Sequence, residues 1–220
     1  MTSRQVEIFR TTCFGSLLDV SNIPFSGILA HEILLRRVHT KNLYEELWFY
    51  IGKRRIRFSR QDFYLITGLR MGDYPVVSGL GDRLCHKYFS GRSQLTYKDL
   101  DQWFGNVTFD DDVDAVKMCL FYVFHKLIMP RDRNRIIQYF VLRLVDNLDE
   151  FNVYPWGTIA WNVLYNSLCT APIKKLTKVK KTSAGDIESY NLYSFCHAFL
   201  VSNSIFLIHY DREKFILLAL

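Results

Sequence analysis

The sequence predicts a mainly helical protein that contains a small β-hairpin, an α+β fold built as a single globular helical domain. Long stretches repeat apolar residues every three or four positions, which is the spacing of a helix with one buried face. Residues 47–51 and 54–58 instead flank Gly52-Lys53 as the two strands of a hairpin would, with mostly apolar side chains on one face. Apolar residues make up 49% of the 220 positions and aromatic residues 15%, which is enough for a substantial core.

The hairpin is the clearest local prediction. Its two-residue loop has glycine at the first central position, which favours a type II′ turn with a positive φ at Gly52. This loop fixes the register, with Ile51 opposite Arg54, Phe49 opposite Ile56 and Leu47 opposite Phe58. Alternation places those side chains on one, mostly apolar face, and the other face carries Trp48 opposite Arg57 and Tyr50 opposite Arg55.

The second face of the hairpin has two interpretations. The structural one is that a helix covers it or that the arginines form cation–π pairs with the aromatic rings. The functional one is a platform for a base or a peptide. We favour the structural interpretation, because an isolated hairpin needs further packing to be stable.

Helix boundaries are marked by capping residues and prolines. Ser59 and Asp62 have the spacing of a capping box, so a helix should follow Ser59 and end at Gly68, with Phe63, Leu65 and Ile66 inward. Thr96 and Asp99 predict a second such start. Residues 26–38 have a helical rhythm, and another helix should start at Trp156, after Pro155, and end at Pro172.

Two further helices are expected to supply the core. Three aspartates at 110–112 open a helix that should end at Met129 and lie at the centre, with a stripe of Val113, Val116, Leu120, Phe124 and Leu127. The next is amphipathic, with its inward positions at Ile136, Ile137, Phe140, Val141, Leu144, Val145 and Leu148.

The net charge of +6 is concentrated in two places. Four cations lie between Lys53 and Arg57, and five lysines follow Pro172 in what reads as an exposed loop. Clustered positive charge indicates an acidic partner such as nucleic acid, whereas a solvated linker is the plainer interpretation of the lysine run. The candidate partner-binding residues are therefore Trp48, Tyr50, Lys53, Arg54, Arg55, Arg57, Lys174, Lys175, Lys178, Lys180 and Lys181.

We find no pattern that predicts catalysis, a metal, a cofactor or a small-molecule substrate. The four acids at 110–112 and 114 are explained by helix capping. Cys85-His86 and Cys196-His197 are neighbours in sequence, so their side chains diverge, and His125 is expected to be a satisfied, semi-buried residue. From the lack of catalytic motifs we expect a non-enzymatic protein. Five scattered cysteines and no signal peptide or membrane-length apolar run predict that it is intracellular.

Four segments together resemble a known plant family. They are FRTTCFGSLLDV at Phe9–Val20, ELWFYIGKRRIRFSRQDFYLITGL at Glu46–Leu69, VKMCLFYVFHKLI at Val116–Ile128 and VDNLDEFNVYPWGTIAWNVLYNSL at Val145–Leu168. They are similar to the plant domain of unknown function numbered nineteen-eighty-five, which is related to the plant mobile domains. The resemblance covers residues 6–201 and leaves 202–220 as a divergent tail.

The chain departs from that family near its end. The family continues YNLYGFP, whereas Tyr190–Tyr193 is followed here by Ser194-Phe195-Cys196. Ser202 and Ile205 stand where a tryptophan and a glutamate are expected. This departure bears on the packing of the last helix.

The resemblance implies a domain carried by Mutator-like transposable elements, often next to a cysteine protease that processes ubiquitin-like modifiers. We therefore expect a non-enzymatic binding module of transposon origin in the nucleus, with nucleic acid or another element-encoded protein as its partner. The alternatives are an N-terminal docking domain for such a protease, here without the protease, and a degenerate gene product.

Overall fold

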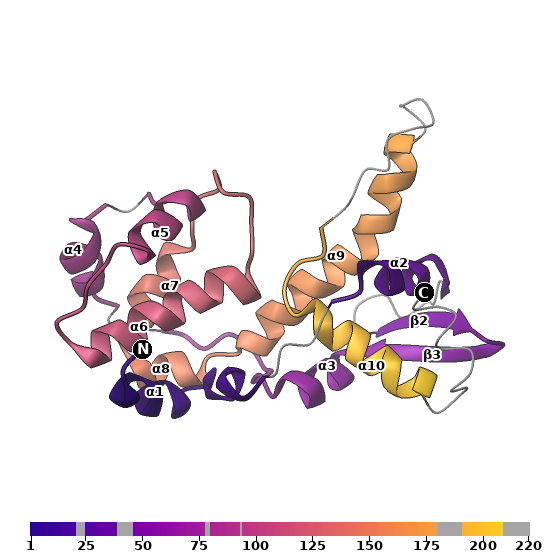
Figure 1. The fold of residues 1–220 in the computed structure, drawn as a ribbon, viewed down its shortest axis with the longest axis horizontal. Helices are drawn as coiled ribbons and strands as arrows, with labels where there is room; N and C mark the ends of the chain where they lie inside the picture. The colour runs from indigo at the N-terminus through magenta and orange to yellow at the C-terminus, as the bar shows by residue number, and fades with distance from the viewer. Residues whose placement is uncertain (21–24, 39–45, 78–79, 93, 180–190, 209–220) are drawn as a thin grey trace. The chain divides into compact units, whose positions relative to one another are not determined.

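A computed structural model describes residues 1–20, 25–38, 46–77, 80–92, 94–179 and 191–208, with only the backbone for 171–179 and 204–208. The chain is mainly helical with one three-stranded antiparallel sheet, which confirms the predicted fold class (Figure 1). It divides into two compact units, which the sequence did not anticipate. Unit 1 comprises Met1–Ser21 and Leu69–Ile159, and unit 2 comprises Asn22–Gly68 and Ala160–Leu220. No helix in the described ranges is long and apolar enough to cross a membrane.

The sheet of unit 2 contains β1 (Arg37–Val38), β2 (Glu46–Ile51) and β3 (Arg54–Ser59) in that order. The predicted hairpin register is confirmed at every pair from Leu47–Phe58 to Ile51–Arg54. Its apolar face is buried beneath α10 (Cys196–Ile208), whose Phe199 ring lies 5.5 Å from that of Phe49 and 5.4 Å from that of Phe58.

Two details of this region differ from the sequence expectation. The turn is type I′ rather than type II′, because φ is positive at both Gly52 (56°) and Lys53 (67°). Both types match the right-handed twist of the strands, so the strand register is the one predicted. The helix expected over 26–38 stops early: α2 spans Gly27–Leu35, and the backbone then turns into β1, where the Arg36 carbonyl accepts the Tyr50 N–H at 2.9 Å.

Helix α3 (Arg60–Thr67) begins and ends as predicted. The Ser59 hydroxyl accepts the Asp62 N–H, the Asp62 carboxylate accepts the Ser59 N–H, and Gly68 closes the helix with φ 66°. Phe63 is buried, but Leu65 is 69% exposed, so its predicted inward position is wrong. A helix turns by about 100° per residue, which places Leu65 nearly opposite Phe63.

The helices of unit 1 surround α6 (Asp112–Val123), the predicted central helix, whose described neighbours include α1 (Ser3–Arg10) and α7 (Tyr139–Leu144). The unit also contains the 3₁₀ turn η1 (Gly15–Asp19), α4 (Arg83–Phe89), α5 (Tyr97–Phe104) and α8 (Leu148–Val153). The capping box of Thr96 and Asp99 is confirmed.

A π-helical turn, η2 (Phe124–Ile128), follows α6 and changes its buried stripe. The Met129 N–H donates to the Phe124 carbonyl, five residues back, at 2.9 Å. One extra residue per turn rotates Leu127 outward, to 41% exposed, and brings Ile128 into the core. The predicted inward position of Leu127 is therefore wrong, whereas Val116, Leu120 and Phe124 are buried as expected.

The amphipathic helix expected over 136–148 is shorter than predicted, because its first residues join another structure. Ile136 forms an isolated β-bridge with Thr96, and the Ile137 N–H donates to the Leu95 carbonyl at 2.9 Å. The helix α7 begins only at Tyr139, and Ile136 is 56% exposed.

Helix α9 (Trp156–Val179) starts after Pro155, as predicted, but continues through Pro172. The prediction of a loop is therefore wrong for Lys174, Lys175 and Lys178, whose backbone is helical. The Lys and Leu residues beyond Pro172 favour helix, and this propensity supports the continuation past the proline. The side chains of these three lysines, and Lys180 and Lys181 altogether, lie outside the described residues.

Helix α10 runs without interruption past Val201, the point at which the family resemblance fades. Ser202 and Asn203 are buried in unit 2, and the Asn203 amide donates to the Phe199 carbonyl at 2.7 Å. The side chain of Ile205 and residues 209–220 lie outside the described residues.

Candidate functional site

On the second face of the hairpin, the two residues farther from the turn, Trp48 and Arg57, lie beside carboxylates of the same unit. The Trp48 indole N–H donates to Glu46 at 2.8 Å, and the Arg57 guanidinium lies 3.9 Å from Glu46 and 4.0 Å from Asp62. Among the described residues Arg57 and Trp48 form no cation–π pair, so that expectation is wrong: the acids compete more effectively for the guanidinium. Trp48 and Arg57 are therefore engaged within the domain.

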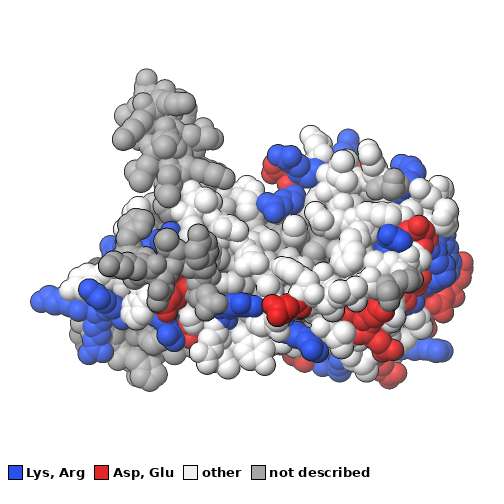
Figure 2. All heavy atoms as spheres, turned by 180° about the vertical axis from the view of Figure 1, so that it is seen from behind, with Lys and Arg blue, Asp and Glu red and all other residues white. Residues whose placement is uncertain are grey.

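The tip of the hairpin, residues 50–55, has a different environment. Tyr50 is 52% exposed, and Lys53, Arg54 and Arg55 are exposed. Neither Lys53 nor Arg55 makes an ion pair with a carboxylate in the described part of the chain. Figure 2 shows Lys and Arg gathered at this end of the hairpin, at the left of the view. The structure thus brings together four of the predicted partner-binding residues and separates Trp48 and Arg57 from them.

The tip presents its cations on a rigid support. The type I′ turn fixes the backbone, and the strands behind it are anchored by the buried side chains of Phe49 and Phe58. Fixed cations can neutralise phosphates, and an exposed tyrosine offers a face on which a base can stack. A two-stranded β-ribbon also has dimensions that the major groove of DNA admits.

The acidic cluster before α6 is divided between capping and ion pairing. Asp111 caps the helix by accepting the Asp114 N–H at 2.7 Å, as the sequence predicted. Asp114 is buried and accepts from Arg83, Lys87 and Tyr88 at 2.6 to 3.1 Å. The Arg83 guanidinium holds the pKa of Asp114 well below its usual range. Sequence reasoning missed this network because Arg83 is distant along the chain and nothing local marks it as a partner.

His125 is fully buried in η2 and hydrogen-bonded through both ring nitrogens. Its Nδ1 lies 2.9 Å from the Phe121 carbonyl, and its Nε2 accepts the Gln138 N–H at 2.9 Å, so the neutral ring carries its proton on Nδ1. Burial lowers the pKa of His125 to about 4. The expectation of a satisfied histidine is confirmed, and its burial is complete rather than partial.

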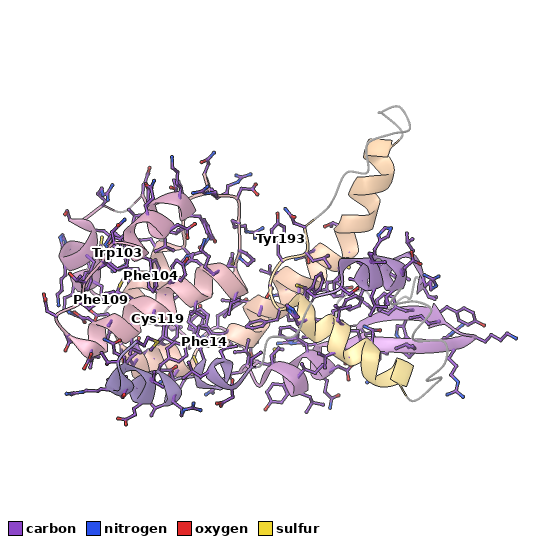
Figure 3. The ribbon with its side chains drawn as sticks, in the orientation of Figure 1. Phe14, Trp103, Phe104, Phe109, Cys119 and Tyr193 are labelled. Carbon is purple, nitrogen blue, oxygen red and sulfur yellow. The ribbon has the colours of Figure 1, made fainter. Side chains whose placement is uncertain are left out.

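The cysteines lie in surroundings that favour the neutral thiol. Burial raises the pKa of Cys13 to about 12 and also raises the pKa of Cys119 and Cys196. Figure 3 shows Cys119 and three aromatic rings of unit 1: Trp103 and Phe104 from the end of α5, and Phe109 after it. The Phe104 ring stacks on that of Tyr122 with centroids 4.1 Å apart, which helps to pack α5 against α6. Among the described residues no group of three or more His, Cys, Asp or Glu is placed to hold a metal ion.

The residues around Pro155, within the segment Val145–Leu168 that resembles the family, are explained by packing within unit 1. The Asn152 side chain accepts the Cys13 N–H at 2.9 Å, and the Trp156 indole donates to the Phe151 carbonyl at 2.8 Å. Gly157 donates its N–H to the Arg70 carbonyl at 2.8 Å. A Cβ at position 157 would lie 2.5 Å from the Leu69 carbonyl oxygen, so only glycine fits. These motif residues identify the fold rather than a chemistry.

These features define a mainly helical domain with a small antiparallel sheet and a basic, exposed hairpin tip. Residues 34–167 match the family described as Domain of unknown function (DUF1985), and the chain belongs to that family. No curated protein and no solved structure match the chain. The matched range contains the whole hairpin, the network around Asp114 and the motif that ends at Gly157.

Proposed function

We propose that this protein is a non-enzymatic nucleic-acid-binding module whose hairpin tip contacts the phosphate backbone. One observation carries the proposal: Lys53 in the type I′ turn and Arg55 at the start of β3 are exposed and make no ion pair in the described part of the chain. Electrostatic contacts of this kind position a protein on nucleic acid without reading its sequence. Action in the nucleus and an origin in a transposable element, which the family resemblance implies, form part of this proposal.

The docking domain for a ubiquitin-like-modifier protease remains the second candidate. It is favoured by Tyr64 and Leu65, which are 46% and 69% exposed on the outer face of α3. Apolar and aromatic residues of this kind are typical anchors of protein interfaces. The first proposal uses the hairpin tip, and the second uses the outer face of α3. Mutations at one surface or the other therefore distinguish them.

The test is the salt dependence of binding to a short DNA duplex. Each phosphate contact contributes about 0.9 to the slope of log K against log salt, so Lys53→Ser with Arg55→Ser should lower the slope by about two. The matched control is Arg4→Ser with Arg10→Ser, which removes the same charge from exposed residues beside Asp112 and Asp19. This control should lower the slope by much less.

Two results would contradict the proposal. One is wild-type protein that does not bind the duplex, and the other is a hairpin variant that behaves like the control. DNA cleavage that requires a metal and disappears in Asp112→Asn would contradict the non-enzymatic assignment.

A further inference from the structure

A second set of cations comes together in unit 1 through a turn that sequence reasoning overlooked. The Arg135 N–H donates to the Asp132 carbonyl at 2.9 Å, which closes the turn. The Lys98 and Tyr97 amides donate to the Arg133 and Arg135 carbonyls at 2.9 and 3.0 Å. These bonds fasten the turn to the first residues of α5, so the backbone of the turn is fixed.

The side chains on and near this fixed backbone are strongly basic. We call the set the turn surface, and its members are all exposed: Arg92, Lys98, Arg131, Arg133 and Arg135. Hydrogen bonds from Thr96 lower the pKa of Asp99, and the charges of Arg92 and Lys98 add to that shift, so both cations lie close to this carboxylate. The Asp99 carboxylate is already used by the cap of α5, and the turn itself contributes one acid, Asp132.

We infer that the turn surface is a second phosphate-contacting surface, carried by unit 1, for the same nucleic acid. The inference rests on the proposed function of the hairpin tip. It extends that function by assigning phosphate contacts to both units of the chain.

The distribution of charge over the whole chain supports this inference. Fourteen of the 28 Lys and Arg residues lie in the turn surface, in the hairpin from Lys53 to Arg57 and in the lysine run from Lys174 to Lys181. The remaining fourteen cations stand against 22 Asp and Glu residues, a net charge of −8. Cations that are gathered at a few places on an otherwise acidic protein suit a polyanion with many phosphates.

The chemistry of the side chains favours phosphate over a protein partner. Four of the five are arginines, whose guanidinium groups bind phosphate in a bidentate manner. Protein interfaces are centred on apolar or aromatic anchors, whereas the five members of the turn surface are all cationic.

The experiment compares the salt dependence of duplex binding for wild type, Arg133→Ser with Arg135→Ser, the hairpin variant Lys53→Ser with Arg55→Ser, and the two combined. The turn variant should lower the slope by about two, and the combined variant by about four. Arg4→Ser with Arg10→Ser again removes equal charge from unit 1 and should have a much smaller effect. If Arg133→Ser with Arg135→Ser changes the thermal unfolding temperature, Arg92→Ser with Lys98→Ser serves as a second variant of the turn surface.

The outcomes separate this inference from the proposed function. Wild-type protein that does not bind DNA overturns both. If the hairpin variant lowers the salt slope by about two while the turn variants behave like the control, only the inference about the turn surface is overturned. Turn variants that lose binding to an acidic peptide while retaining duplex binding also overturn it.

Discussion

The guanidinium of Arg83 donates to both carboxylate oxygens of Asp114, at 2.7 and 3.1 Å, and so joins α4 to α6. The same guanidinium reaches Asp146 at 2.6 Å, and Lys117 approaches Asp146 at 2.9 Å. The Asp114 side chain is 4% exposed, whereas that of Arg83 is 47% exposed. A buried carboxylate thus depends on partners that reach it from the surface.

Asp114→Asn should lower the free energy of unfolding by about 2–3 kcal/mol, because charged hydrogen bonds to a buried group are lost. Urea denaturation at pH 7 measures the loss. Asp112→Asn is the matched control and should cost less than about 1 kcal/mol, since Asp112 lies beside the exposed Arg4. Equal losses in the two variants would show that Asp114 is not an anchor.

His125 should make the protein sensitive to mild acid. Its folded pKa of about 4 lies below its ordinary value of 6.5, so the unfolded chain takes up the proton first. The stability that this histidine contributes is complete above pH 6.5 and falls by about 3 kcal/mol as the pH approaches 4. The carboxylate of Asp114, whose pKa is depressed, loses its contribution only below about pH 4.

His125→Gln tests this window directly. Urea denaturation from pH 4 to 7 should show a steep pH dependence in the wild type and a flatter one in the variant. The same slope in both proteins would mean that His125 is accessible to protons in the folded state.

Gly157→Ala should destabilise unit 1 by at least about 2 kcal/mol, because the added methyl group meets the backbone at Leu69 and Arg70. Thermal unfolding with circular dichroism measures the effect. Gly105→Ala is the control: its Cβ would lie at an ordinary 3.5 Å from the nearest backbone oxygen, with φ −71°. The control should be neutral or slightly stabilising, and a tolerated Gly157→Ala would refute the close approach.

Ser194→Gly should stabilise the protein by about 1 kcal/mol. Ser194 has φ 69°, a conformation that favours glycine, and its hydroxyl is buried without a hydrogen-bond partner among the described residues. Chemical denaturation of the two proteins gives the difference, and a destabilised glycine variant would show that the hydroxyl has a favourable role.

Features set by neighbouring residues were predictable from the sequence. The capping box of Ser59 and Asp62, and the register set by the two-residue loop, depend on short-range geometry alone. The type I′ turn was missed because lysine seldom adopts a positive φ, and Lys53 does so here.

Features set by distant residues were not predictable. The π turn at Phe124–Ile128 shifts the buried stripe from Leu127 to Ile128 without any local signal. Arg133 and Arg135 acquire their place beside Lys98 only through backbone bonds formed across more than thirty residues. For the candidate site, the sequence indicated the cations of the hairpin tip but not the turn surface.

The central claim is that the hairpin tip contacts phosphate, and amide chemical shifts of ¹⁵N-labelled protein during titration with a DNA duplex test it most directly. We predict that the shift changes are concentrated at Lys53, Arg54 and Arg55, and that they fade as salt is added. Changes confined to α3 around Tyr64 and Leu65, or no changes at any amide, would contradict the account.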